Sequence, residues 1–342
     1  MIGAARNYFG EAWEAWNGFW FTPTSPSTLS AIRVLAGAML LYTHIVWTYD
    51  LDAFFAPDGW LPQQVMEEAR LATNDPDGPT RPEVASQRFM PSHFNYIHSH
   101  KLRLAAHLGA LLVFFLLTIG LFSRTMALLG YILAVSYANR ITPGAYFGLD
   151  KINCMLVMYL MLGPCGARYS IDRLWRLRRG APSEVPPSTW ANVAIRLIQL
   201  HMCVIYFFSA LGKLQGPTWW LGEAMWYSVA NKEYQTMDLT WLINHPWLVN
   251  FMTHLAVYWE LTYPALIWPR LTRPWMLAMA VILHGGIIVA LGMPTFGLVM
   301  LIGNLAFVSP QTVRKIFDPL ARRIALATLG TARQSPKPVA AT

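Results

Sequence analysis

Residues 196–224, RLIQLHMCVIYFFSALGKLQGPTWWLGEA, decide how this sequence is interpreted. They overlap a long apolar run, 195–214, that predicts a membrane-spanning helix. Steps of three and four residues stay on one helix face. That face collects a mostly polar seam: Arg196, Gln199, Cys203, Tyr206, Ala210 and Lys213. Because an ionisable side chain costs roughly 2.5–3.5 kcal/mol at the centre of a spanning helix, Lys213 is a candidate functional residue. The alternative is that its ammonium group extends to the lipid headgroups.

The composition of the chain is that of a membrane protein. Charged residues make up 13% of the 342 residues, against about 25% in typical soluble domains. The net charge of +8 is unevenly placed and no run mixes basic residues with aromatics, so we expect no nucleic-acid partner. Cys154, Cys165 and Cys203 lie in or beside apolar segments without a C-x-x-C pair, which predicts buried thiols rather than disulfides.

Apolar stretches of spanning character predict an all-α, polytopic bundle of about eight transmembrane helices. They are residues 29–49, 102–122, 126–141, 152–165, 193–213, 247–268, 275–291 and 296–308. Both ends carry amphipathic patterns that predict an interfacial helix at each terminus. The expected organisation is an interfacial segment 1–26, a transmembrane domain 27–310 and a basic cytoplasmic tail 311–342.

Basic loops indicate the orientation, because positive charge near the ends of spans marks the cytoplasmic side. With eight spans, the basic segments after spans two, four, six and eight fall on one side of the membrane. The long loop 50–100 between spans one and two is acidic. Lys101 and Arg103, at the outer end of span two, run against this pattern. The sequence thus predicts a multi-pass protein of the cell membrane with both termini in the cytoplasm.

Two further ionisable residues lie within predicted spans. His284 is followed by Gly285-Gly286, which allow close approach of a backbone or a ligand, or it is a neutral packing residue. Glu260 must be paired or protonated, because burial favours the neutral form of a carboxyl group. Its candidate partners are Arg33, Arg196 and His284, and a buried ion pair that fixes the helix register is the alternative to a functional role.

Asp150, Lys151 and Asn153 open the fourth apolar stretch on the predicted outer side. Since Lys213 ends the fifth stretch on that side, the two groups are expected to share a pocket, unless residues 150–153 are only a solvated helix start. The histidines within the spans lack a second ligand at i+3 or i+4, so we expect no metal site.

The segment 196–224 resembles the vitamin K-dependent gamma-carboxylase superfamily, also called the horizontally transferred transmembrane (HTTM) domain. The family pattern has an aromatic pair, a small residue and Lys-Leu, then Trp, an aromatic or aliphatic pair and Gly. The matching residues are Tyr206-Phe207-Phe208, Ala210, Lys213-Leu214 and Trp219-Trp220-Leu221-Gly222. Glu223 departs from the pattern, which has a small residue there. Asp150-Lys151, Ser170-Ile171-Asp172, Glu260, His284, Met293 and Phe296 look similar as well.

The resemblance implies a chemistry. In the carboxylases the matching lysine is the base that deprotonates the vitamin K hydroquinone before oxygen adds, and a histidine sits at the catalytic centre. The resemblance thus implies Lys213 and His284 as catalytic residues, a vitamin K-like quinol as cofactor or substrate, and contacts from the matching side chains: Asp150, Lys151, Asn153, Tyr206, Trp219 and Glu260. Cys154 stands where carboxylases often carry histidine.

The sequence and its resemblance to the carboxylases leave two classes of function. Carboxylases hold their glutamyl substrate in a large extramembrane C-terminal region, whereas this chain ends soon after the last apolar stretch. The expected protein is therefore a carboxylase-like or quinol-oxidising membrane enzyme that oxidises or epoxidises a quinol or another lipophilic substrate. The alternative is a non-catalytic membrane protein with the same fold: a transporter, an immunity factor or an assembly factor.

Overall fold

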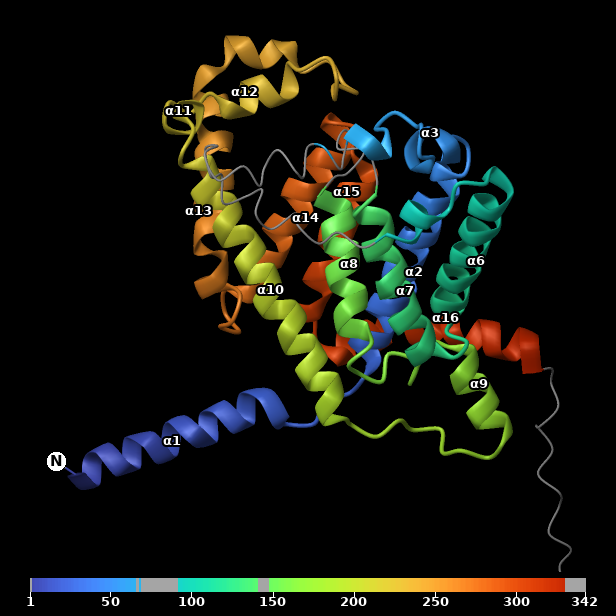
Figure 1. Cartoon of the computed structure of the whole chain (residues 1–342). Coiled ribbons are helices and arrows are strands. Elements are labelled where there is room, and N and C mark those ends of the chain that lie inside the picture. The colour runs from blue at the N-terminus through green and yellow to red at the C-terminus, as the bar shows by residue number, and fades with distance from the viewer. Residues whose placement is uncertain (1, 66–67, 69–91, 141–147, 330–342) are drawn as a thin grey trace, which may run out of the picture.

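The computed structural model describes residues 2–65, 68, 92–140 and 148–329, and these residues contain no β-strand (Figure 1). The long helices of the bundle are α2 (Ser27–Trp47), α6 (His100–Ile119), α7 (Ser123–Ala138), α8 (Gly148–Leu160), α10 (Thr189–Lys213), α13 (Pro246–Leu266), α14 (Arg273–Ala290) and α15 (Pro294–Asn304). The peripheral helices are α1 (Ile2–Phe21), α3 (Leu51–Phe55), η2 (His93–Tyr96), α9 (Ile171–Arg178), α11 (Pro217–Trp220), α12 (Ala224–Val229), η4 (Thr240–Asn244), η5 (Leu305–Phe307) and α16 (Pro310–Leu329).

Each predicted apolar stretch contains a helix, but the helices differ in length. Four of the described helices, α2, α6, α10 and α14, are long and apolar enough to cross a membrane. α7 and α8 have only 16 and 13 residues, and α15 with η5 forms another short apolar helix. α8 ends at Leu160 rather than at the expected Cys165, since Gly163-Pro164 follow and proline cannot continue a helix. The protein therefore has the expected all-helical class, while the number of eight spans is still a prediction.

The core of the bundle lies around α2, which packs against α6, α8, α10 and α15. One buried apolar cluster joins these helices, with Leu29, Ile32, Phe114, Leu156 and Val299 completely buried. Outward-facing positions on the surrounding helices are also apolar and exposed, including Leu112 on α6, Val204 and Phe208 on α10, and Ile282 on α14. A bundle that is apolar both inside and outside suits a lipid environment.

Arg33 joins three segments at one end of the bundle. It is completely buried and donates to the backbone carbonyls of Leu117, Thr118, Cys165 and Tyr169. The carbonyls of Leu117 and Thr118 belong to the last turn of α6, where carbonyls lack the usual intrahelical donor; Leu117 also accepts the cap N–H of Gly120 at 3.2 Å. The expectation that Arg33 pairs with Glu260 is therefore wrong, because backbone carbonyls use its donors.

Arg103, which runs against the charge pattern, is neutralised locally. Its side chain is almost buried and pairs with Asp52 in α3, with Nε 2.7 Å from Oδ1. His100 contacts the second oxygen of the same carboxylate at 2.5 Å. Although burial raises the pKa of Asp52, the hydrogen bonds from Arg103 and His100 outweigh it and hold that pKa below its ordinary value. Arg103 thus contributes little free positive charge to its end of the bundle.

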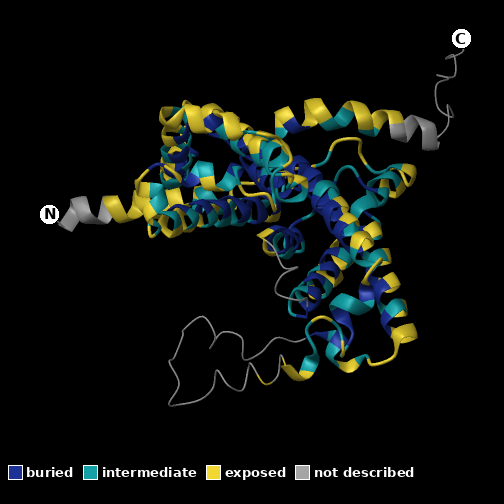
Figure 2. Cartoon of the chain, turned by 90° about the horizontal axis from the view of Figure 1, so that it is seen from above, coloured by how far each residue is buried: buried dark blue, intermediate teal, exposed yellow. Residues whose placement is uncertain are grey.

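The helices near the termini lie at the same end of the bundle as α9, and α11 with α12 lies at the opposite end (Figure 1). α1 extends away from the body and is exposed along most of its described length, as is much of α16 (Figure 2). The predicted amphipathic helices at both termini are present, and their interfacial location is still a prediction. The part of the predicted tail from residue 330 onward lies outside the described residues.

Candidate active site

Lys213 is the last residue of α10, and its side chain points toward Glu260 of α13. Its Nζ lies 2.5 Å from Oε2 of Glu260 and donates to Oγ of Ser209 at 2.8 Å. The ring of Trp219 lies 5.4 Å from the ammonium nitrogen, close enough for a cation–π contact. The two charged side chains retain only 22% and 14% of their accessible surface. Lys213 therefore forms a largely buried ion pair, which the headgroup alternative does not predict.

A neutral hydrogen-bond network lies two turns deeper on the same face of α10. Asn304 of α15 donates from Nδ2 to the hydroxyl of Tyr206 at 2.8 Å, and Tyr263 of α13 donates to Oδ1 of Asn304 at 2.7 Å. The Tyr206 hydroxyl lies 2.7 Å from Nε2 of His284 on α14. All four side chains are buried. The network thus joins four helices, α10, α13, α14 and α15, below the ion pair.

The hydrogen bonds of Tyr206 favour one tautomer of His284. The hydroxyl accepts from Asn304, and Nε2 of His284 is the one acceptor among its hydrogen-bond partners in the described residues, so its proton is assigned to Nε2 and a neutral imidazole then carries its hydrogen on Nδ1. No described residue accepts from Nδ1. Electrostatic interactions also connect Lys213 with His284 and Glu260 with Tyr206. The ion pair and the neutral network are therefore two parts of one site, with one buried N–H available for a ligand.

Asn153 on α8 is another buried residue whose polar atoms lack a partner among the described residues. Its side chain is 1% exposed, and neither its amide oxygen nor its nitrogen has a hydrogen-bond partner among the described residues. Phe296 connects the start of α8 with His284: a Cβ atom at Gly148 would lie 3.0 Å from its ring, whose centroid lies 6.2 Å from that of His284. Asn153 and His284 thus lie on two helices, α8 and α14, that both pack against α15.

Asp150 and Lys151 lie on the same helix outside this network. Asp150 is largely buried and Lys151 is exposed. Lys213 forms its hydrogen bonds with Ser209 and Glu260, so neither residue is a direct partner of the candidate base. Whether residues 150–153 share a pocket with Lys213 stays a prediction.

A hollow of about 470 Å³ opens beside Trp219 at the end of the bundle that carries α11 and α12. Tyr227, Asn231, Tyr234 and Met293 line it together with Trp219. Gly222, which follows Trp219 closely in the chain, adopts a φ of 76°. A Cβ atom at this position would lie 1.9 Å from the side chain of Asn250. Because Trp219 contacts both Lys213 and the hollow, the hollow is a candidate route to the ion pair.

The expected partners of Glu260 were wrong, since the structure pairs it with Lys213. Arg196 instead donates to the carbonyl oxygen of Phe19 and to Gln199, while His284 bonds to Tyr206. The sequence reasoning missed Asn304, which connects Tyr206 and Tyr263. The sequence signal for Asn304 is a single amide in the apolar run 296–308. Glu260 and His284 became candidates by the same criterion, a polar side chain within an apolar run.

Helices with apolar outer surfaces and a partly ionic, partly neutral buried site define a helical membrane protein. The chain belongs to the HTTM family: the model of the HTTM domain matches residues 83–311, about two thirds of the chain. This match includes all eight candidate site residues as well as Asn304. No curated protein matches the chain, and no solved structure matches it.

Proposed function

We propose that this chain is a membrane enzyme that oxidises or epoxidises a quinol or another lipophilic hydroxylated substrate, with Lys213 as the base. In the epoxidation, a quinol and dioxygen give the quinone epoxide and water. The observation that carries the proposal is the position of Lys213. The Lys213 side chain pairs with the Glu260 carboxylate, and the neutral network beneath this pair contains the unpartnered Nδ1 of His284.

The ion pair with Glu260 is compatible with a base. A lysine must lose its proton before it accepts one, and the carboxylate of Glu260 lies close enough to take that proton. Transfer of a proton from Nζ to Oε2 along the 2.5 Å contact gives a neutral amine and a neutral acid without changing the net charge of the site. Glu260 would therefore hold the proton of Lys213 while the amine takes one from the substrate.

The unpartnered polar groups suit a neutral, hydroxylated substrate. The Nδ1–H of His284 can donate to a substrate oxygen, and the Asn153 amide can both donate and accept. A quinol offers two such hydroxyl groups on an apolar ring. Asp150, Lys151, Tyr206 and Trp219 are proposed as further substrate contacts, with Trp219 at the side of entry.

The membrane topology belongs to the same proposal. Eight spans place both termini on the cytoplasmic side of the cell membrane, supported by the basic loops and by the position of α1 and α16 at one end of the bundle (Figure 1). The Lys213 site would then open toward the opposite face.

Lys213→Arg tests the assignment. Arginine can retain the pair with Glu260, so the variant should fold, but it is effectively never deprotonated and cannot act as a base. We expect turnover of the quinol found by lipid extraction and mass spectrometry of the purified protein to fall by about 10²-fold or more. Lys232→Arg, at an exposed position, should retain full turnover. An active Lys213→Arg protein would rule out the base. A protein without bound quinone and without quinol turnover would favour the non-catalytic class.

A further inference from the structure

The surface of α16 carries a second hollow, far from Lys213 in the fold. It has a volume of about 520 Å³ and lies at the end of the bundle shared by α1 and α9. Three cations line it, Arg314, Lys315 and Arg322, together with Gln311, Asp318 and Pro319. All three cationic side chains are exposed. This basic hollow has no role in the proposed reaction.

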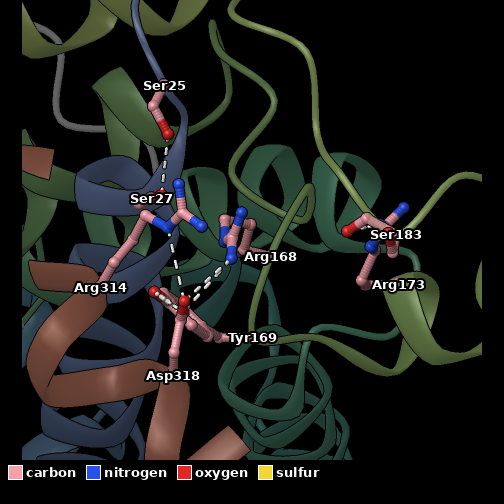
Figure 3. A network of polar contacts seen from close by, with 8 residues as sticks. All are labelled: Ser25, Ser27, Arg168, Tyr169, Arg173, Ser183, Arg314 and Asp318. Atoms are coloured by element: carbon pink, nitrogen blue, oxygen red, sulfur yellow. Dashed lines mark hydrogen bonds and ion pairs between the residues drawn. The ribbon is translucent and has the colours of Figure 1, made fainter. Parts of the chain in front are cut away.

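Among the described residues that line the basic hollow, Asp318 is the only carboxylate, and it is already neutralised from the bundle side (Figure 3). Tyr169 donates to Asp318 at 2.8 Å, Arg168 donates to both of its oxygens at 3.2 and 3.3 Å, and Arg314 contacts it at 3.4 Å. Burial raises the pKa of Asp318, but these donors outweigh it and hold the pKa below its ordinary value. Asp318 therefore attaches α16 to the bundle and leaves the hollow with an excess of positive charge.

Two of the cations have no acidic partner. Within the described part of the chain, neither Lys315 nor Arg322 forms an ion pair. Both are among the residues that line the hollow. The hollow thus offers unused donors that suit the oxygens of a phosphate group.

Apolar side chains project beside these cations. Ile316 is 65% exposed and Leu320 is 58% exposed. Val313 is buried, and Phe317 packs on Tyr169 with 5.4 Å between ring centroids. One face of α16 is therefore docked on the bundle, while two large apolar side chains of the same helix remain uncovered.

We infer that the basic hollow binds the headgroup phosphate of an anionic phospholipid, and that Ile316 and Leu320 pack against its acyl chains. A nucleic acid or an acidic protein surface would use the cations but leave the adjacent apolar side chains without a matching partner. An amphipathic helix with a cationic face and large apolar residues is suited to the boundary between headgroups and acyl chains. The inference does not depend on catalysis at Lys213.

Native mass spectrometry of the full chain in detergent, titrated with phosphatidylglycerol or phosphatidylcholine, tests this site. The triple variant Arg314→Gln, Lys315→Gln, Arg322→Gln should bind phosphatidylglycerol at least about tenfold more weakly than wild type. The matched control removes three exposed positive charges outside the hollow: Arg179→Gln, Lys232→Gln, Arg270→Gln. It should bind within about twofold of wild type.

Three results would overturn the site. They are equal binding of the two lipids by wild type, equal losses in the triple variant and its control, or displacement of the bound lipid by inorganic phosphate alone. The last would mean that the hollow recognises only the anion. Because all the substituted side chains are exposed, thermal unfolding should find both variants folded.

Discussion

Removing both members of the Lys213–Glu260 pair should cost clearly less stability than the sum of the two single removals. A fully buried pair loses about 3–5 kcal/mol when one partner is removed, since a lone charge stays buried. An exposed pair is worth about 0–1 kcal/mol. The side chains here retain 22% and 14% of their surface, so we expect a value between these limits. Lys213→Met and Glu260→Gln should each lower the free energy of unfolding by about 2–3 kcal/mol.

The double variant makes the test decisive. It contains no lone charge, so its loss should be about 2 kcal/mol smaller than the sum of the single losses. The free energies can be measured by reversible unfolding in mixed micelles. The same two substitutions at exposed Lys232 and Glu233 should change stability by no more than about 0.5 kcal/mol. Additive effects at Lys213 and Glu260 would refute the buried pair and restore the headgroup alternative.

Two further predictions concern polar side chains that differ in whether they have hydrogen-bond partners. Asn153→Leu should raise the free energy of unfolding of the ligand-free protein by about 1–2 kcal/mol, because it removes a buried amide without partners, and should weaken quinol binding measured by extraction. Asn192→Leu should instead destabilise the protein, since that buried amide donates to the carbonyls of Phe19 and Trp20; stabilisation in both or in neither would contradict the reasoning. Asp318→Asn should lower stability at pH 7 by about 1–2 kcal/mol, as expected for hydrogen bonds to a charged group. Because the pKa of Asp318 is lowered on folding, its contribution is complete above the unfolded pKa of about 3.9 and is lost as the pH falls through the folded value. Unfolding curves of wild type and Asp318→Asn should thus converge below about pH 4, and a constant difference down to pH 3 would contradict the assignment.

Local periodicity explains what could be predicted from the sequence. The seam from Gln199 to Lys213 lies within one helix, so its face follows from spacing alone, and Gln199, Cys203, Tyr206 and Ala210 on that face are all buried. Pairing between helices is different, because it depends on the register in which they pack. Glu260 lies 47 residues from Lys213, and the charges of Arg33 and Arg196 were equally plausible partners.

Some partners also belong to the backbone, which side-chain patterns do not reveal. Arg33 looks like a free charge in an apolar helix, yet its donors are used by carbonyls at the end of α6 and in the segment after α8. The position of those carbonyls follows from where the helices end, and helix ends are the least certain part of a sequence-based prediction.

The site separates charge from hydrogen bonding along α10. Lys213 and Glu260 lie at the helix end, where part of their surface is exposed, whereas Tyr206, Asn304 and His284 are buried two turns away and form neutral hydrogen bonds. This order follows from the cost of burial, since a charge is penalised more strongly than a hydrogen-bonded hydroxyl or amide. Under the proposed function, a neutral hydroxylated ring would therefore bind at the level of His284 without a charge beside it. Its proton would leave toward the Lys213 end, where the pair with Glu260 can hold the resulting charge.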